Sequence, residues 1–280
     1  MDAQRTTSSL SLTFVGHATV LLEMDGVRLL TDPLLRRRIG VLLRRSPIPG
    51  PGLRRDLDAV LISHAHLDHL DVPSLRLIDR ATPVVVPRGL GRLLRRIGFE
   101  PLEMDVGDVV AIGPAGEGSA PAGPVPGGVR ITAVPADHPG TRYPLVGAAP
   151  ALGYVIERAM TVYFAGDTGL YPEMGDIGPV DVAVLPVGGW GPRLPDDHLN
   201  PLSAAKALRL LRPAACVPVH WGTIYPPWLP PEFNARWSRW PHVFARYAAH
   251  LAPEVEVRVL QPGETTVFRP AEVGEEAGGA

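Results

Sequence analysis

The 280-residue sequence contains one cysteine, Cys216, and one lysine, Lys206. One cysteine excludes an intramolecular disulfide framework and any zinc site built from several thiolates. Arginine carries nearly all of the positive charge, and the formal net charge is only −2. Because nucleic-acid-binding proteins normally carry a basic excess, we expect no nucleic acid as a partner.

Long hydrophobic runs are also missing. No apolar stretch approaches the length of a transmembrane helix, and the first residues, MDAQRTTSSLSL, lack the apolar centre of a signal peptide. We therefore expect a cytoplasmic protein. The polar ends, residues 1–9 and 271–280, are expected to be disordered, and the Gly/Pro/Ala-rich stretch 113–128 is expected to be a mobile connector.

Two stretches of the chain share one layout. Residues 12–33 contain two β-rich apolar runs around Met-Asp-Gly, a hairpin signal, and end near Asp32. Residues 152–168 repeat the order of strand, short polar turn and strand, and end near Asp167. Another apolar run follows each of them. The repetition predicts one domain over residues 1–280, built as a layered sandwich of helices and strands from two similar halves.

Helices are fewer than strands in this interpretation. Residues 88–98 have helical spacing and end at a glycine. Residues 200–213 begin with Asn200 as a helix cap and Pro201 at the first helical position.

The sequence LISHAHLDHLD, residues 61–71, places three histidines and two aspartates within eight positions after an apolar run. On a helix, His64 and His66 would point to different faces, whereas at the end of a strand they can converge on one point. Asp68 and His69 can then turn toward a neighbouring point. Neutral imidazoles and carboxylates are ligands of Zn²⁺, Mn²⁺ and iron, so the loop predicts metal binding.

One loop cannot complete two metal sites, so further ligands are expected at other strand ends. His138, Asp167 and His220 each follow a β-rich apolar run and precede a turn. The duplicated layout strengthens the case for Asp167, because it occupies the position of Asp32 in the other half. A lone histidine is more often structural, but the 61–71 loop favours a ligand role for His138 and His220.

These motifs carry a resemblance to a known family. HAHLDH, His138, GDTG and HWGT resemble, in this order, the motifs of the metallo-β-lactamase superfamily. Within it, GHATVLLE, LLTDP and LPVGGWGPR are most similar to the branch of the N-acylphosphatidylethanolamine-hydrolysing phospholipase D, and more loosely to lactonases that open ascorbate-6-phosphate. The resemblance implies an α+β protein: a four-layer αβ/βα sandwich with two pseudo-symmetric halves and metal ions at one edge between them.

The same resemblance implies two divalent metal ions, zinc in the first instance and manganese or iron as alternatives. The implied ligands are His64, His66 and His138 for the first ion, Asp68, His69 and His220 for the second, and Asp167 as a bridge between them. A water between the two ions would lose a proton near neutral pH and attack the substrate. This predicts a metal-dependent hydrolase, a phosphodiesterase in the first instance, with a lactonase or carboxylic ester hydrolase as the alternative.

Other residues receive supporting roles. Asp68 and His198 are the predicted catalytic residues, because a histidine in a segment like that of His198 protonates the leaving oxygen in related phosphodiesterases. Asp32 and Asp71 are candidates to hold metal-bound histidines by hydrogen bonds, although Asp71 can equally be a helix cap. His17 and Trp221 are expected to lie near the substrate.

The substrate itself is less constrained. Residues 34–55 alternate apolar clusters with arginines, which fits a lid over phosphate head groups, contact with a membrane surface, or a solvated arginine face. The phospholipase-like proteins have Gln-His-Trp where this chain has Asp137, His138 and Pro139, a departure that weakens the case for lipid. We expect a small-molecule or lipid substrate and leave peripheral membrane contact and a homo-oligomer open.

Overall fold

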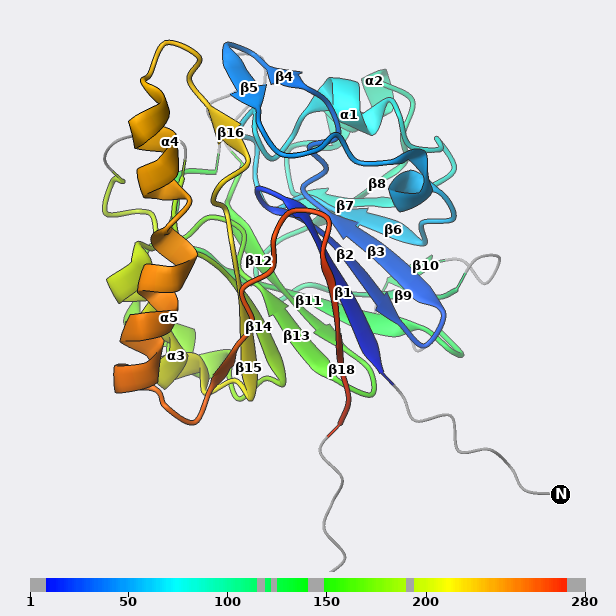
Figure 1. Cartoon of the computed structure of the whole chain (residues 1–280). Coiled ribbons are helices and arrows are strands. Elements are labelled where there is room, and N and C mark those ends of the chain that lie inside the picture. The colour runs from blue at the N-terminus through cyan, green and yellow to red at the C-terminus, as the bar shows by residue number, and fades with distance from the viewer. Residues whose placement is uncertain (1–8, 115–118, 122–124, 141–148, 190–193, 271–280) are drawn as a thin grey trace, which may run out of the picture.

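The structure is a computed structural model that describes residues 9–114, 119–121, 125–140, 149–189 and 194–270. Two large sheets face each other across the centre of the molecule (Figure 1). In spatial order, the first sheet contains β18 (Thr265–Phe268), β1 (Leu10–Gly16), β2 (Thr19–Met24), β3 (Val27–Thr31), β6 (Ala59–Leu61), β7 (Val84–Pro87) and β8 (Pro101–Met104). The second contains β10 (Ser119–Pro121), β9 (Val109–Ile112), β11 (Val129–Pro135), β12 (Leu152–Glu157), β13 (Thr161–Phe164), β14 (Val182–Pro186), β15 (Ala215–Val219) and β17 (Glu256–Val257).

Helices cover the outer faces of both sheets (Figure 1). On the first sheet these are α1 (Val72–Leu75) and α2 (Gly91–Arg96); on the second they are α3 (Pro201–Leu211) and α5 (Trp240–Leu251), with α4 (Pro231–Trp237) leading into α5. Short 3₁₀ helices, η1 (Pro51–Arg54) and η2 (Pro172–Asp176), lie in connections. The order helix, sheet, sheet, helix confirms the predicted αβ/βα sandwich.

Successive side chains of a strand point to opposite faces of the sheet, so the first sheet contributes to two hydrophobic cores. In β3, Leu29 packs between the sheets while Leu30 packs under α1 and α2. In β6, Leu61 likewise packs between the sheets, and Val60 packs under α1 and α2. Strands buried on both faces need apolar residues at successive positions, which is why these runs read as continuously hydrophobic.

The two halves repeat one topology. The antiparallel hairpin β2–β3 continues into the parallel strand β6, and the hairpin β12–β13 continues into the parallel strand β14. Asp25 and Gly26 join β2 to β3 with φ of 50° and 86°, the left-handed pair that a tight hairpin requires. The duplication and this hairpin were both predicted from the sequence.

The predicted helices are present but shorter than expected. Within residues 88–98, α2 covers Gly91–Arg96. The segment 200–213 forms α3 with Asn200 as its cap, where the Asn200 side chain accepts hydrogen bonds from Leu202 N and Ser203 N. Cys216 lies in β15 and is fully buried in the core.

Two segments interpreted above as a possible lid and as a connector contain short strands. Residues 34–55 contain β4 (Arg38–Ile39) and β5 (Leu42–Arg44), which form a three-stranded sheet with β16 (Ile224–Tyr225). The stretch 113–128, expected to be a connector, contains β10 paired with β9, and its other parts 115–118 and 122–124 lie outside the described residues. Apart from Ser9, the terminal segments 1–9 and 271–280 also lie outside them.

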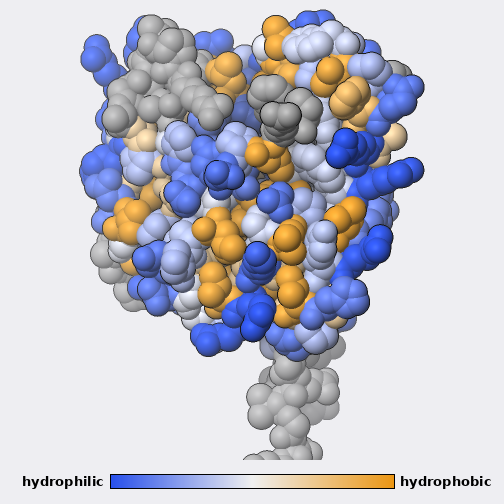
Figure 2. Space-filling model, turned by 90° about the vertical axis from the view of Figure 1, so that its left-hand side faces the viewer, coloured by the Kyte–Doolittle hydropathy of each residue, from blue (hydrophilic) through white to orange (hydrophobic). Residues whose placement is uncertain are grey.

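The outer surface of α3, α4 and α5 is shown in Figure 2, where hydrophobic residues lie scattered between hydrophilic ones. Leu202, Phe233 and Tyr247 are exposed large hydrophobic residues on these helices. Within the described residues, every helix is too short or too polar to cross a bilayer.

Strand direction determines where the functional loops meet. In the first sheet β1, β3 and β6 run the same way, because β1 and β3 both pair antiparallel to β2 and β6 pairs parallel to β3. In the second sheet β11, β13, β14 and β15 share one direction for the same reason. The carboxyl ends within each set therefore lie along one edge of their sheet, where ligand sites are commonly built.

Candidate metal centre

The predicted ligands all stand just beyond the carboxyl ends of these strands. His64 and His66 follow β6, and His138 follows β11. Asp167 follows β13, and His220 follows β15. Side chains from four segments that are far apart in the sequence are brought to one place, because the carboxyl-end edges of the two sheets meet there.

The first group of candidate ligands is His64, His66, His138 and Asp167, whose ligand atoms lie within 4.8 Å of one another. His138 Nε2 lies 3.2 Å from His66 Nδ1. This spacing suits two nitrogens bound to a single ion, since zinc–nitrogen bonds are about 2.0–2.1 Å long. The group contains the residues that the resemblance implies for the first metal ion.

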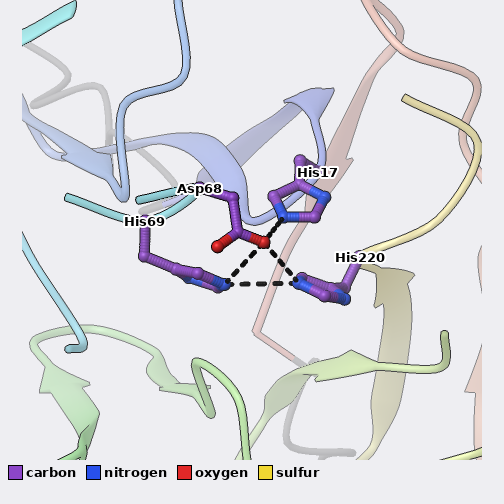
Figure 3. Close-up of side chains that lie close together, drawn as sticks. All are labelled: His17, Asp68, His69 and His220. Carbon is purple, nitrogen blue, oxygen red and sulfur yellow. Dashed lines mark hydrogen bonds and ion pairs between the residues drawn. The ribbon is translucent and has the colours of Figure 1, made fainter. Parts of the chain in front are cut away.

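The second group is His17, Asp68, His69 and His220, again within 4.8 Å (Figure 3). His69 Nε2 and His220 Nε2 lie 3.2 Å apart, and Asp68 Oδ2 lies 3.9 Å and 4.0 Å from them. Three members match the residues implied for the second metal ion. The fourth, His17, was expected at the substrate instead.

Asp167 lies between the two groups. Its Oδ2 is 3.2 Å from His69 Nε2, and its Oδ1 is 3.2 Å from His220 Nε2. The same carboxylate belongs to the first group, with His64, His66 and His138. A carboxylate in this position faces both groups of ligand atoms at once.

Four of the histidines share one hydrogen-bonding arrangement. The Nδ1 atom of each ring faces a hydrogen-bond acceptor, so the Nε2 atom is directed into the centre. The pairs are His64 with Ser63 Oγ (2.9 Å), His69 with Asp32 Oδ2 (2.7 Å), His138 with the Asp197 carbonyl (2.9 Å) and His220 with the Gly188 carbonyl (2.8 Å). Carbonyls and carboxylates only accept, and the Ser63 hydroxyl donates its proton to Asp32 Oδ2, so these Nδ1 atoms donate. Such partners fix the ring and the tautomer of metal-bound histidines.

Burial adjusts the charges of the same residues. It lowers the pKa of His220 to about 3 and holds the pKa of His64 well below its usual range. Burial opposes ionisation of Asp167, but His220 and His69 outweigh it and keep the pKa of Asp167 well below normal. His64 and His220 are therefore neutral and Asp167 is ionised, which are the forms that bind metal, whereas Asp167 and Asp32 outweigh burial at His69 and hold its pKa well above the usual range.

The donor atoms fit a divalent cation. Neutral His220 already donates through Nδ1, so its Nε2 is a lone pair that faces Asp167 Oδ1, another acceptor, at 3.2 Å. Buried atoms without a hydrogen-bond partner here are His64 Nε2 and Asp167 Oδ1. Acceptors that face one another in a buried site are stabilised by positive charge between them, and nitrogen and oxygen donors of this kind suit zinc, manganese or iron.

Gly166 allows the two halves to approach closely at this point. It has a φ of +62°, and a Cβ atom on it would lie 2.5 Å from the Cβ of Ser63. Only glycine accepts both the left-handed backbone and that distance. The glycine therefore lets Asp167 lie directly beside the 61–71 loop.

His198 lies at the open side of the centre. Its Nε2 is 3.4 Å from Asp167 Oδ2, and its Nδ1 donates to Asp197 Oδ1 at 2.7 Å. Burial opposes protonation, but the contacts with Asp167 and Asp197 outweigh it and raise the pKa of His198. The structure thus brings His198 beside the predicted bridging residue, as its assigned catalytic role requires.

Asp71 takes the second of its two predicted positions, the helix cap, and Trp221 does not lie where it was expected. Asp71 caps α1 by accepting from Ser74 N, and it also accepts two hydrogen bonds from Arg36, so it holds no metal-ligand histidine. Trp221 is 3% exposed; its ring packs against Phe14 in the core and its Nε1 donates to the Pro218 carbonyl, so it cannot contact substrate. Successive residues at a strand end point in different directions, and His220 takes the direction of the metal centre.

Asp32 does take the predicted position. Besides accepting from His69 Nδ1, it accepts from Ser63 N at 2.7 Å and from Ser63 Oγ at 2.6 Å. Its φ of 34° places it in the left-handed region, where a non-glycine residue needs surrounding contacts to hold it. One buried carboxylate therefore fixes a residue of each candidate metal group, directly for His69 and through Ser63 for His64.

Replacing Asp32 with alanine should weaken metal affinity about 10- to 100-fold, because His69 and Ser63 lose their common acceptor. The measurement is competition for zinc against a chromophoric chelator. Asp71→Ala is the matched control: it removes another buried carboxylate from the same loop region and should lower stability without changing zinc affinity. Equal zinc affinities for wild type and Asp32→Ala would contradict this role.

Sequence reasoning missed three supports: Ser63, Asp197 and the carbonyl of Gly188. Ser63 precedes His64 and Asp197 precedes His198, and this adjacency was the only sequence feature that could have indicated their roles. No sequence feature could have indicated the role of the Gly188 carbonyl, because every residue has a carbonyl group and only the fold brings this one to His220.

The αβ/βα sandwich with two abutting His/Asp groups defines a metal-dependent hydrolase. The family described as beta-lactamase superfamily domain matches residues 27–221, and the chain belongs to this superfamily.

Similar proteins agree with this assignment. The chain is 31% identical over 263 residues to a UPF0173 metal-dependent hydrolase of Methanopyrus kandleri, covering 91% of this chain and 98% of that one. It is 32% identical over 247 residues to N-acyl-phosphatidylethanolamine-hydrolyzing phospholipase D 1 of Caenorhabditis elegans, covering 78% of this chain and 65% of that protein. Among solved structures, Igni18, a metallo hydrolase of Ignicoccus hospitalis, matches with a TM-score of 0.69 and 27% identity over 93% of this chain and 99% of its own.

Proposed function

We propose that the protein is a dinuclear metal-dependent phosphodiesterase. The observation that carries this proposal is the position of Asp167, whose two carboxylate oxygens lie 3.2 Å from His220 Nε2 and His69 Nε2 while the residue also belongs to the group of His64, His66 and His138. A single ion would need only one of the two groups. A carboxylate shared by both groups supports two ions, zinc in the first instance.

When bound, two divalent ions supply a water of lowered pKa and positive charge beside the scissile group. The chain supplies the direction of approach. The side chains of Asp68 and His198 are each 14% exposed, whereas those of His69 and Asp167 are 0% and 2% exposed. Substrate would therefore reach the centre on the side of Asp68 and His198, the two residues proposed to be catalytic.

A proton for the leaving group can come from His198. Asp197 accepts from its Nδ1 and fixes the ring, so Nε2 is directed toward Asp167. A positioned imidazole can donate a proton to the departing oxygen, and this kind of general acid contributes about 10²–10⁴-fold to rate. This role suits any substrate whose leaving alkoxide needs a proton, a phosphodiester among them.

The choice of phosphodiester rests on the similarity to the Caenorhabditis elegans phospholipase D. The alternative is a lactonase or carboxylic ester hydrolase that uses the same ligands. Purified protein loaded with zinc or manganese should hydrolyse bis-p-nitrophenyl phosphate faster than a lactone or a p-nitrophenyl carboxylic ester, with Asp167→Ala as the inactive control. Cleavage of the lactone or ester without cleavage of the phosphodiester would establish the alternative.

Replacing His198 with glutamine should lower kcat on a phosphodiester about 10²–10⁴-fold because the acid is lost. The metal content, measured by plasma mass spectrometry, should stay at the wild-type value, since His198 is not among the proposed ligands. A substrate with a good leaving group, such as p-nitrophenolate, should lose less activity than one with an alkyl leaving group. Loss of metal from His198→Gln would mean that the residue is a ligand.

A further inference from the structure

His17 lies in the short turn between β1 and β2, at the same edge as the metal centre. It is 1% exposed, which leaves almost no surface for a substrate to touch. Its φ of 59° is left-handed, a conformation that costs free energy for a residue other than glycine. Such a conformation persists where surrounding contacts hold it, so the contacts of His17 indicate what it does.

The first contact is with Asp68. His17 Nε2 lies 3.0 Å from Asp68 Oδ2, closer than His69 Nε2 or His220 Nε2, and the carboxylate accepts the hydrogen bond (Figure 3). Asp68 is the more exposed partner, at 14% of its side chain, and it follows Leu67, which is 51% exposed. A buried donor therefore sets the direction of a carboxylate on the open side of the centre.

The second contact is with His220. The two rings lie with centroids 3.9 Å apart, and His220 N donates to the His17 carbonyl at 2.8 Å. His220 also has a left-handed φ, of 63°. The backbone of His17 thus supports the turn that directs the His220 ring away from the core.

The third contact is with Thr223. His17 N donates to Thr223 Oγ1 at 2.6 Å, and Thr223 Oγ1 donates to the Trp221 carbonyl at 3.1 Å. Both partners lie within three residues of His220 in the sequence. The amide, the carbonyl and the ring of His17 therefore all bind the loop of His220 or the carboxylate of Asp68, so the first strand of the chain is tied to ligands from two other loops.

We propose that His17 is a positioning residue that orients Asp68 and His220 for the second metal ion, in place of the substrate contact expected from the sequence. The proposal rests on the dinuclear centre proposed above. With Oδ2 of Asp68 held by His17, the carboxylate is fixed in direction before an ion arrives, and the His220 ring is held at its side. Preorganised ligands bind more tightly because less conformational freedom is lost on binding.

The test is a titration of the metal-free protein with Co²⁺, followed by its visible absorbance and by calorimetry. His17→Asn is the loss variant, because asparagine tolerates the left-handed backbone but is too short to reach Asp68. His17→Gln is the rescue variant, because its amide nitrogen can stand in for Nε2. His242→Ala, an exposed histidine on α5, is the control.

We expect His17→Asn to bind the first equivalent of Co²⁺ as wild type does and the second about 10- to 100-fold more weakly, as for other groups that orient metal ligands. His17→Gln should recover most of the lost affinity, and His242→Ala should match wild type. Two tight equivalents in His17→Asn would overturn the role of His17 while leaving the dinuclear centre intact. A single equivalent in wild type would instead overturn the dinuclear proposal, whatever the variants do.

Discussion

Asp167→Ala is expected to lower kcat/KM on a phosphodiester by about 10²–10⁴-fold and to reduce the metal content below that of wild type. Removing one partner from a buried charged pair costs about 3–5 kcal/mol, which corresponds to this range of affinity or rate. Asp167 is 2% exposed and contacts His69, His198 and His220, so no water can replace it freely. Its loss removes the shared ligand of both candidate metal groups.

Asp167→Asn separates charge from shape in this experiment. The amide has nearly the volume of the carboxylate but carries no negative charge, so it should also lose metal, with less loss of stability than alanine. Metal content and initial rates of the two variants should be measured in the same buffer. Full activity with a full complement of metal in Asp167→Ala would show that the centre is built differently.

Removing the metal is expected to abolish activity and to lower the melting temperature by on the order of 10 °C. An ion held at a thousand times its dissociation constant stabilises the folded state by about 4 kcal/mol, and each kcal/mol corresponds to about 2–4 °C in a chain of roughly this size. Without the ion, His220 Nε2 and Asp167 Oδ1 face each other as acceptors in a buried site. The measurement is scanning calorimetry before and after dialysis against a chelator.

The matched control for metal removal is His66→Ala, which lacks one ligand of the first group. Its melting temperature should fall less on chelation than that of wild type, because it has less bound metal to lose. Adding back zinc should restore both activity and melting temperature in wild type. If chelation leaves the melting temperature of wild type unchanged, the centre does not contribute metal-linked stability.

Much of the fold follows from local sequence patterns. The Asp25–Gly26 hairpin and the cap at Asn200 depend on residues within a few positions of each other, so the sequence contains all of the information. The repeat of hairpin and parallel strand is also visible as a repeat of apolar runs. The α2 helix is shorter than its pattern suggests, because Gly89 and Gly98 on either side of it have left-handed φ values of 101° and 89°.

The sequence by itself determined the residues that can bind metal. The crowding of His64, His66, Asp68 and His69 after a strand permits few other interpretations, and strand ends that carry His138, Asp167 and His220 are local features too. Strands of one direction in one sheet end at a shared edge, so the convergence of His138, Asp167 and His220 could be inferred, and the family resemblance implied that the other half of the chain meets them there. The roles of residues outside the metal-binding motifs could not be inferred in this way.

Tertiary structure alone decided which neighbouring residues assist the centre. Asp32 and Asp71 were both candidates to hold a metal-bound histidine, yet only Asp32 reaches a ligand histidine, while Asp71 caps a helix. His17 and Trp221 both adjoin motif glycines, yet the left-handed backbone at His17 and His220 directs these two rings to the metal edge and leaves Trp221 in the core. Backbone handedness at single turns sets those directions, and the contacts that hold it come from segments up to 206 positions away, as between His17 and Thr223.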